Sequence, residues 1–158
     1  MKITNRYMKI LVVALVPLFL NGCLNDLFKQ DDHTYDGPDV VEFRPATRSV
    51  NESDTGTNTA SANVQLIATS HSAALPINFS VDSGNSTAQA GTHYTMATPS
   101  PVTIAADQWS TPVTVQTVQN SLAAGNSVTL VLILDGNNSE GVSPSENYKT
   151  FTVTINGN

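Results

Sequence analysis

The sequence has little charge: Asp, Glu, Lys and Arg make up only 13% of its 158 residues. That is about half the ~25% of an average soluble domain, which excludes a coiled coil or a charged helical bundle. Cations are the scarcer sign, with 7 Lys and Arg against 13 Asp and Glu and a net charge of −6. Because binding to phosphates needs a basic face, we expect no nucleic-acid partner.

The chain also has a single cysteine, Cys23. One thiol excludes an internal disulfide and any zinc site built from several thiolates. The length allows one domain of ordinary size plus a tail, so one hydrophobic core must hold this domain without cross-links.

The N-terminus carries the features of an export signal. Lys2, Arg6 and Lys9 form a basic region, and the uncharged, mostly aliphatic run at residues 10–20 follows it. A membrane-spanning helix needs about 20 apolar residues, so this shorter run is typical of the hydrophobic region of a secretory signal.

The run ends in Leu20-Asn21-Gly22-Cys23, which resembles the lipobox of bacterial lipoproteins. The resemblance implies that residues 1–22 are a signal peptide and that Cys23 is lipidated and anchors the chain in a membrane; an ordinary signal peptide with an incidental cysteine is the alternative. Removal of the signal leaves 4 Lys and Arg against 13 Asp and Glu, a net charge of −9. Such a chain repels anionic headgroups, so the lipid must do the anchoring.

Residues 23–38 have too little apolar periodicity to pack and are interpreted as a flexible acidic tether. Lys29-Gln30-Asp31-Asp32 is similar to signals that send lipoproteins of the Bacteroidota to the outer face of the outer membrane. We therefore expect a lipid anchor in the bacterial cell envelope at the outer membrane, either surface-exposed or facing the periplasm. Metal binding in this segment would require costly ordering, so no site is expected there; its potential ligands are Asp31, Asp32, His33 and Asp36.

From residue 39 to residue 158 apolar and polar side chains alternate with a period of two, which is typical of half-buried strands. Turn-forming clusters separate these runs, and no segment shows helical spacing. We expect an all-β, antiparallel β-sandwich of about seven strands, with a barrel as the weaker alternative. The nearly continuous apolar run at 128–134 predicts a central strand covered on both faces. The expected strands lie at 41–43, 62–68, 77–81, 102–104, 113–115, 128–134 and 151–155.

Several of these segments resemble the Calx-β domain. They are Val41-Glu42-Phe43, Val50-Asn51-Glu52, Ala88-Gln89-Ala90-Gly91-Thr92-His93-Tyr94, Val102-Thr103-Ile104 and Val113-Thr114-Val115. The resemblance covers residue 39 to the C-terminus and implies an immunoglobulin-like sandwich, similar also to uncharacterised Bacteroidota lipoproteins. It implies that Tyr94 is a packed residue.

Some Calx-β domains bind calcium through several acids. Here Glu52 matches an early glutamate of that pattern, His93 stands in place of an aspartate, and the acidic loop is matched by residues 124–127, which hold no acid. Calcium requires six to eight oxygen ligands with several carboxylates, so we expect no calcium and no other metal or cofactor. The weak metal candidates are Glu52, Asp54 and Asp135.

No catalytic site is expected. In Ser70-His71-Ser72 neighbouring side chains point apart, so neither serine is activated without a distant partner. The chain contains none of the common nucleophile, metalloprotease or phosphate-binding motifs. We therefore predict that the protein is not an enzyme.

The sequence favours a lipid-anchored binding or structural module that contacts a protein or a glycan. The alternatives are a glycan-capture accessory lipoprotein of a nutrient-uptake system and an envelope assembly subunit that uses strand addition at a sheet edge. Trp109 and Tyr148 are the candidate ligand-binding residues. For Trp109 a place in the core or as cover of a sheet end is favoured over a ligand platform.

Overall fold

The structure is a computed structural model that describes residues 35–69 and 71–158. Strands dominate this part of the chain, and one short 3-10 helix, η1 (Asn138–Glu140), interrupts them. The strands are β1 (Val40–Arg44), β2 (Thr47–Asn51), β3 (Thr59–Ile67), β4 (Leu75–Val81), β5 (Tyr94–Met96), β6 (Val102–Ile104), β7 (Ser110–Thr117), β8 (Ser127–Gly136), β9 (Ser143–Pro144) and β10 (Thr150–Asn156).

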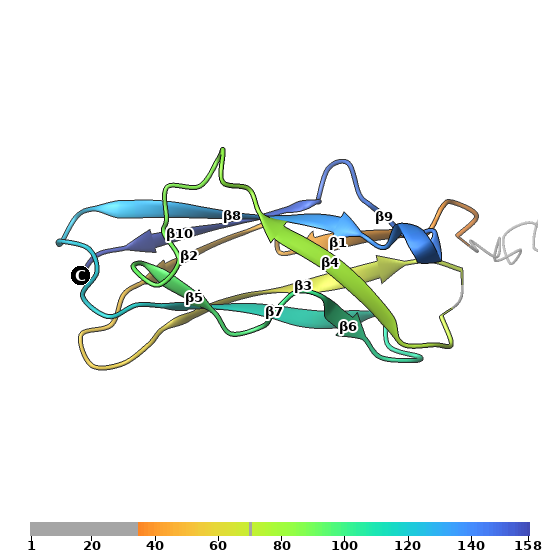
Figure 1. Cartoon of the computed structure of the whole chain (residues 1–158), viewed down its shortest axis with the longest axis horizontal. Helices are drawn as coiled ribbons and strands as arrows, with labels where there is room; N and C mark the ends of the chain where they lie inside the picture. Colours follow the sequence, from red (N-terminus) through yellow and green to blue (C-terminus); the bar gives the residue numbers. More distant parts are fainter. Residues whose placement is uncertain (1–34, 70) are drawn as a thin grey trace, which may run out of the picture. The chain divides into compact units, whose positions relative to one another are not determined.

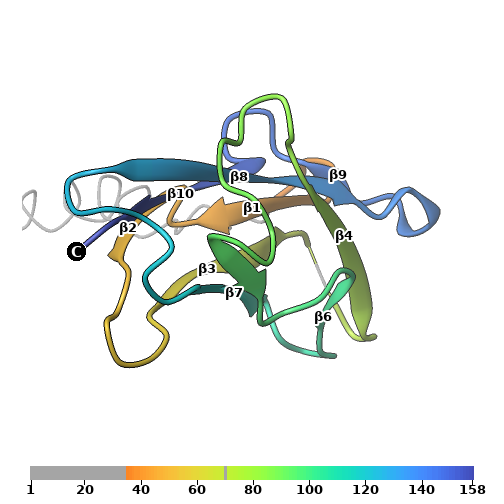
Figure 2. The ribbon, with the colours of Figure 1, turned by 60° about the vertical axis from the view of Figure 1, so that its left-hand side comes forward.

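The strands form two packed sheets of five, in the orders β5-β7-β3-β1-β9 and β2-β10-β8-β4-β6 (Figures 1 and 2). β1 pairs parallel with β9, and β2 pairs parallel with β10; the remaining pairings are antiparallel. β1 and β2 follow each other in the chain but belong to different sheets, because the chain crosses over at residues 45 and 46. The predicted all-β sandwich is confirmed.

The period-two pattern of the sequence places alternate side chains in the core. Along β3 every second residue from Ala60 to Leu66 is buried. Between the sheets, the ring centroids of Phe43 on β1 and Phe151 on β10 lie 5.7 Å apart. Such aromatic pairs contribute about 0.5–1.5 kcal/mol beyond the area that they bury. Tyr94 on β5 is 4% exposed, so its expected packing is confirmed.

The apolar run at 128–134 forms most of β8, which lies between β10 and β4. The prediction of a central strand is confirmed. Its inward residues Leu130, Leu132 and Leu134 are buried, as is the outward Val131, whereas the outward Ile133 is only half-buried. The outer face of β8 is therefore covered only in part.

Three strands were missed by the sequence pattern: β2, β5 and β9. β2 is an edge strand in which Val50 is the only half-buried residue, so the sequence shows no alternation there. β5 has three residues and β9 has two, which is too short to show a period. These strands form through pairing with β10, β7 and β1, which local sequence does not encode.

The two ends of the sandwich differ in what they hold. Residues 35–39 lead into β1 at one end, which we name the tether end; the β3–β4 and β6–β7 connections and η1 lie there as well (Figure 1). The far end carries the β2–β3 and β7–β8 connections and the C-terminus. Within residues 35–69 and 71–158, no helix is long and apolar enough to cross a membrane.

Candidate functional site

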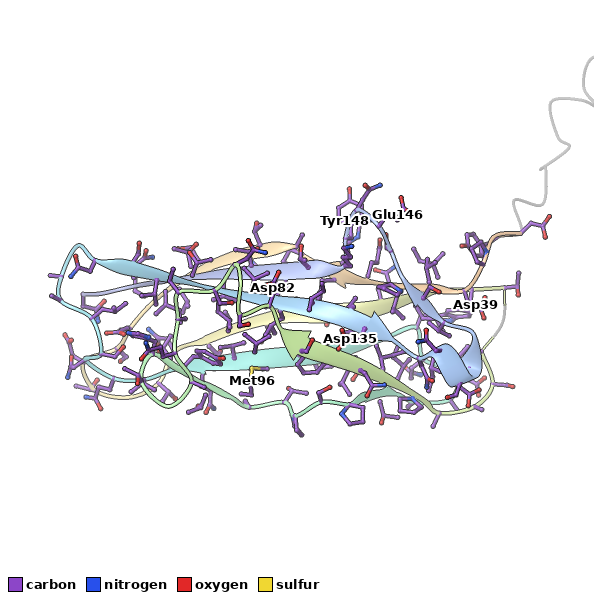
Figure 3. All side chains as sticks on the ribbon, turned by 45° about the horizontal axis from the view of Figure 1, so that its top comes forward. Asp39, Asp82, Met96, Asp135, Glu146 and Tyr148 are labelled. Carbon is purple, nitrogen blue, oxygen red and sulfur yellow. The ribbon has the colours of Figure 1, made fainter. Side chains whose placement is uncertain are left out.

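A pocket of about 170 Å³ opens at the tether end. Four separate chain segments form it: the residue before β1, the end of β3, the β3–β4 connection and the segment around η1. In Figure 3, Asp39 lies at this end of the domain, where the described chain begins. The lining residues are Asp39, Leu66, His71, Ser72, Ala73, Ala74, Leu75, Glu140 and Val142.

The pocket combines an apolar base with acidic groups. Leu66, Leu75 and Val142 are 4%, 7% and 2% exposed and belong to the hydrophobic core, so the base of the pocket is the end of that core. Asp39 is half-buried and Glu140 is exposed. No lysine or arginine lines the pocket, so its electrostatic potential favours cations over anions.

His71 connects the pocket to Trp109. Its Nε2 lies 3.0 Å from the carbonyl oxygen of Ala105, and its ring meets the indole of Trp109 edge-on with centroids 6.3 Å apart. The backbone carbonyl of Trp109 accepts the N–H of Leu66 at 2.8 Å, which extends the β3–β7 pairing by one residue. Trp109 is 44% exposed. It is thus excluded from the core and lies at the surface beside His71, and its role as end cover or as ligand platform stays a prediction.

His71, Ser72 and Asp39 have the residue types of a hydrolytic triad and line one pocket. A nucleophile and its base must lie within hydrogen-bond reach, about 2.6–3.2 Å. Among the described residues, the partner of the His71 ring is the Ala105 carbonyl, and neither Ser72 nor Asp39 bonds to that ring. The geometry thus gives the pocket groups that can bind a ligand but no activated nucleophile.

Asn137 fixes the wall of the pocket. Its side chain is buried and donates to the carbonyl oxygen of Pro76 at 2.8 Å, while its Oδ1 accepts the backbone N–H of Ser139 at 3.2 Å as the N-cap of η1. Asn137 and Val142 also exchange two backbone hydrogen bonds, of 2.8 and 3.0 Å. Because η1 ends at Glu140, this network holds that carboxylate at the rim.

Glu52, a weak metal candidate, is at the far end and is 2% exposed. Its Oε2 accepts the backbone N–H of Ser121 at 3.0 Å and that of Leu122 at 3.1 Å. The hydroxyl of Ser121 donates to the other carboxylate oxygen. The carboxylate is therefore used to hold the β7–β8 connection.

The other two metal candidates do not complete a site around Glu52. Asp54 is exposed, with an Oδ1 that lies 3.5 Å from the Asn158 amide nitrogen. Asp135 is exposed on β8, where Ser80 donates to it at 3.3 Å.

Glu52 directly follows Asn51, which pairs through Asn156 of β10 with Ser127 at the start of β8. Asp135 is eight residues further along β8 than Ser127. At ~3.3 Å per residue, the two lie about 26 Å apart. The Nδ1 of His93 accepts the backbone N–H of Gln89 at 2.9 Å, so this ring nitrogen is not available to a metal. Within the described ranges no three His, Cys, Asp or Glu side chains are grouped for a metal, so the calcium set does not fit.

Tyr148 lies on the loop between β9 and β10, together with Glu146 (Figure 3). The guanidinium carbon of Arg44 is 4.2 Å from the centre of its ring, and Arg44 Nε donates to the buried Glu42 carboxylate at 2.7 Å. The hydrogen bond to Glu42 is the main cause that raises the pKa of Arg44 above its ordinary value. Tyr148 is 39% exposed, but one face of its ring is occupied by this cation.

The structure does not bring Tyr148 and Trp109 together. The carbonyl oxygen of Tyr148 accepts the N–H of Phe43, so Tyr148 lies beside β1 on the side away from β3. Trp109 directly precedes β7, so both β1 and β3 lie between the two residues. This separation is three strand spacings, about 14 Å. Cys23, the segment that resembles a lipobox and most of the predicted tether lie outside the described residues, as do the metal candidates Asp31, Asp32 and His33. Asp36 is exposed.

Comparison with known proteins gives one informative likeness. No protein-family model and no curated protein matches the chain. Among solved structures, the crystal structure of CBD12 from CALX1.2, which holds Calx-β domains, matches with a TM-score of 0.57 and 17% identity over 75% of this chain and 44% of that one. The chain thus spans less than half the length of that structure.

Two further structures are more distant. The secreted serine protease VesC from Vibrio cholerae gives a TM-score of 0.40 at 13% identity, covering 74% of this chain and 23% of that chain. The third cohesin ScaC of Acetivibrio cellulolyticus, solved with the ScaB dockerin, gives 0.33 at 8% identity, covering 75% and 98%. The likeness to CBD12 is one of fold: the chain has a Calx-β-like, immunoglobulin-like β-sandwich.

Proposed function

We propose that the protein is a lipid-anchored lipoprotein of the bacterial cell envelope, at the outer membrane, whose sandwich is a non-catalytic binding module for a partner protein. The observation that carries the binding function is the pocket at the tether end, with its apolar base and acidic groups. A concave, partly apolar site with a few convergent polar groups is the usual form of a ligand site. The resemblance of Leu20-Asn21-Gly22-Cys23 to a lipobox supports the proposed location.

The anchor would limit how far the domain and its pocket lie from the membrane. Residues 23–38 join Cys23 to the tether end and, at ~3.4 Å per residue, span at most about 55 Å. A partner reached through the pocket would therefore lie in the envelope within that distance of the bilayer.

Fractionation of cells that make the full chain tests the anchor. Wild type should sediment with the outer membrane and incorporate an alkyne-tagged fatty acid, and Cys23→Ala should lose the label and leave the membrane fraction. A Cys23→Ala chain that remains membrane-bound with its signal removed would contradict the lipoprotein proposal.

Glycan capture is the second candidate, and the half-exposed Trp109 beside the pocket is the observation that favours it. Indole rings pack against sugar faces, so a glycan site there would depend on this side chain. Retardation of the full chain in polysaccharide gels that disappears with Trp109→Ala would favour glycan capture over a protein partner.

A further inference from the structure

We propose that the pocket at the tether end is a socket for a primary ammonium group on an aliphatic chain, namely a lysine side chain of the partner protein. This inference rests on the proposed binding function and names the group that is bound. Three properties of the pocket support it: its size, its charge and its lining residues.

The size suits one side chain. The pocket measures about 170 Å³, which is below the roughly 300–1,000 Å³ of sites for drug-sized ligands. Most of its exposed lining is polar, and Leu66, Leu75 and Val142 add apolar contacts, so a ligand with a polar end and an apolar stem suits it. An aliphatic stem gains from removal of its methylene groups from water.

The charge selects a cation. Asp39 and Glu140 belong to different segments, before β1 and at the end of η1, and line the pocket together. The cationic side chains of residues 35–69 and 71–158 are Arg44, Arg48 and Lys149, and none lines the pocket. An anionic ligand would be repelled by the two carboxylates, whereas a cation would be attracted by both.

The compact charge of an ammonium suits a pocket of this size. A lysine side chain ends in a point charge on a flexible four-carbon stem, whereas arginine ends in a wider planar fork that matches the two oxygens of one carboxylate. Asp39 and Glu140 line the pocket from two different segments, and a compact charge suits that arrangement better than the fork. The Nε2 of His71 is already engaged by the Ala105 carbonyl oxygen, 3.0 Å away.

The indole of Trp109 makes the test direct. Trp109 is the one tryptophan of the chain and packs edge-on against His71, so occupation of the pocket should change its fluorescence. Detergent-solubilised full chain is titrated at constant ionic strength with Nα-acetyl-lysine amide and, separately, with its uncharged analogue Nα-acetyl-norleucine amide. A single side chain is expected to half-saturate the signal at millimolar concentration, and norleucine should give no saturable change.

Two variants with almost unchanged shape remove the charges. Asp39→Asn and Glu140→Gln should each weaken lysine binding roughly tenfold, as expected for loss of a charge-assisted hydrogen bond. Glu146→Gln is the matched control, because Glu146 is on the β9–β10 loop and does not line the pocket; it should bind like wild type. Circular dichroism of each variant verifies the fold.

The outcomes separate this inference from the proposed function. Equal binding of lysine and norleucine amides, or undiminished binding by both carboxylate variants, would overturn the lysine socket and leave a binding module with another ligand. Saturable binding of cellobiose without binding of the lysine amide would overturn it in favour of a glycan. A wild-type chain that is not membrane-anchored but still binds the lysine amide would contradict the proposed lipoprotein location and would not affect the lysine socket.

Discussion

The carboxylate of Glu52 accepts the backbone N–H of Ser121, 69 residues further along the chain, at 3.0 Å. The same oxygen accepts the N–H of Leu122 at 3.1 Å, and Glu52 is 2% exposed. Glu52 matches a glutamate of the calcium-binding pattern, but in this structure it joins the end of β2 to the β7–β8 connection. Its carboxylate oxygens accept N–H and O–H donors of the protein, which leaves the acid little capacity for a metal.

Truncation of this side chain should destabilise the domain. Glu52→Ala leaves the N–H groups of the half-buried Ser121 and Leu122 without their acceptor, which costs about 2 kcal/mol. We expect the melting temperature to fall by roughly 5–10 °C in a thermal unfolding experiment. Asp54→Ala is the control, because Asp54 is exposed, and it should change the melting temperature little. Equal melting of both variants would contradict the structural role of Glu52.

Calcium should not stabilise the protein. Glu52 is occupied by the β7–β8 connection, and Asp135 lies about 26 Å from it along β8, so the carboxylates cannot share one ion. Melting in calcium well above the ~1 mM affinity of extracellular calcium modules should match melting in chelator to within about 1 °C. A rise of several degrees with calcium would show that a site exists.

Gly136 is a position where only glycine fits. Its φ is +75°, and a Cβ there would lie 2.5 Å from the carbonyl oxygen of Val142, a backbone atom that cannot move aside cheaply. Gly136→Ala combines left-handed strain of about 1–2 kcal/mol with this clash and should lower the free energy of unfolding by at least that amount. Denaturant titration measures it.

The matched control for this substitution is Gly56→Ala. Gly56 has no atom within 4 Å of an added Cβ and no positive φ. Its replacement should leave stability unchanged or raise it slightly, because alanine restricts the unfolded chain. Similar destabilisation by both substitutions would contradict the backbone argument for Gly136.

Tyr94 should make stability depend on alkaline pH. Burial raises the pKa of its hydroxyl above the ordinary value, because the ionised form loses its hydration. Since the folded-state pKa exceeds the ~10 of an unfolded chain, the neutral form contributes fully below pH 10. That contribution is lost as the pH rises through the raised pKa. In a pH titration followed by tyrosinate absorbance, one tyrosine should ionise at a higher pH than the others, and Tyr94→Phe should remove that step. A titration curve unchanged by Tyr94→Phe would contradict the raised pKa of Tyr94.

The alternation of apolar and polar residues was enough to predict the class of fold. Period two along β3 and β10 requires one buried and one outward face, and the sequence contains no competing helical pattern. The edge strand β2 escaped prediction because Val50 is its only half-buried residue, and β9 because two residues carry no period. Strands of this kind are set by their pairing partners.

The candidate pocket could not be predicted from the sequence, because it too depends on contacts between distant segments. Asp39 and Glu140 stand in separate connections with no motif around either, and His71 belongs to a Ser-His-Ser run that predicts nothing by itself. The register of β1 with β3 and the cap that Asn137 places on η1 bring these side chains to one end of the sandwich. A local window of sequence contains none of that information.

By itself the sequence determined the two-faced strands and the chemical character of the chain, because side-chain alternation and charge are local properties. The expected lipid anchor at Cys23 belongs to the same level, since a lipobox is a contiguous motif. Only the tertiary structure decided that Glu52 binds a loop, that Trp109 lies beside His71, and that Asp39 and Glu140 share a pocket. Those relationships join residues far apart in the chain, and sheet pairing is what brings them together.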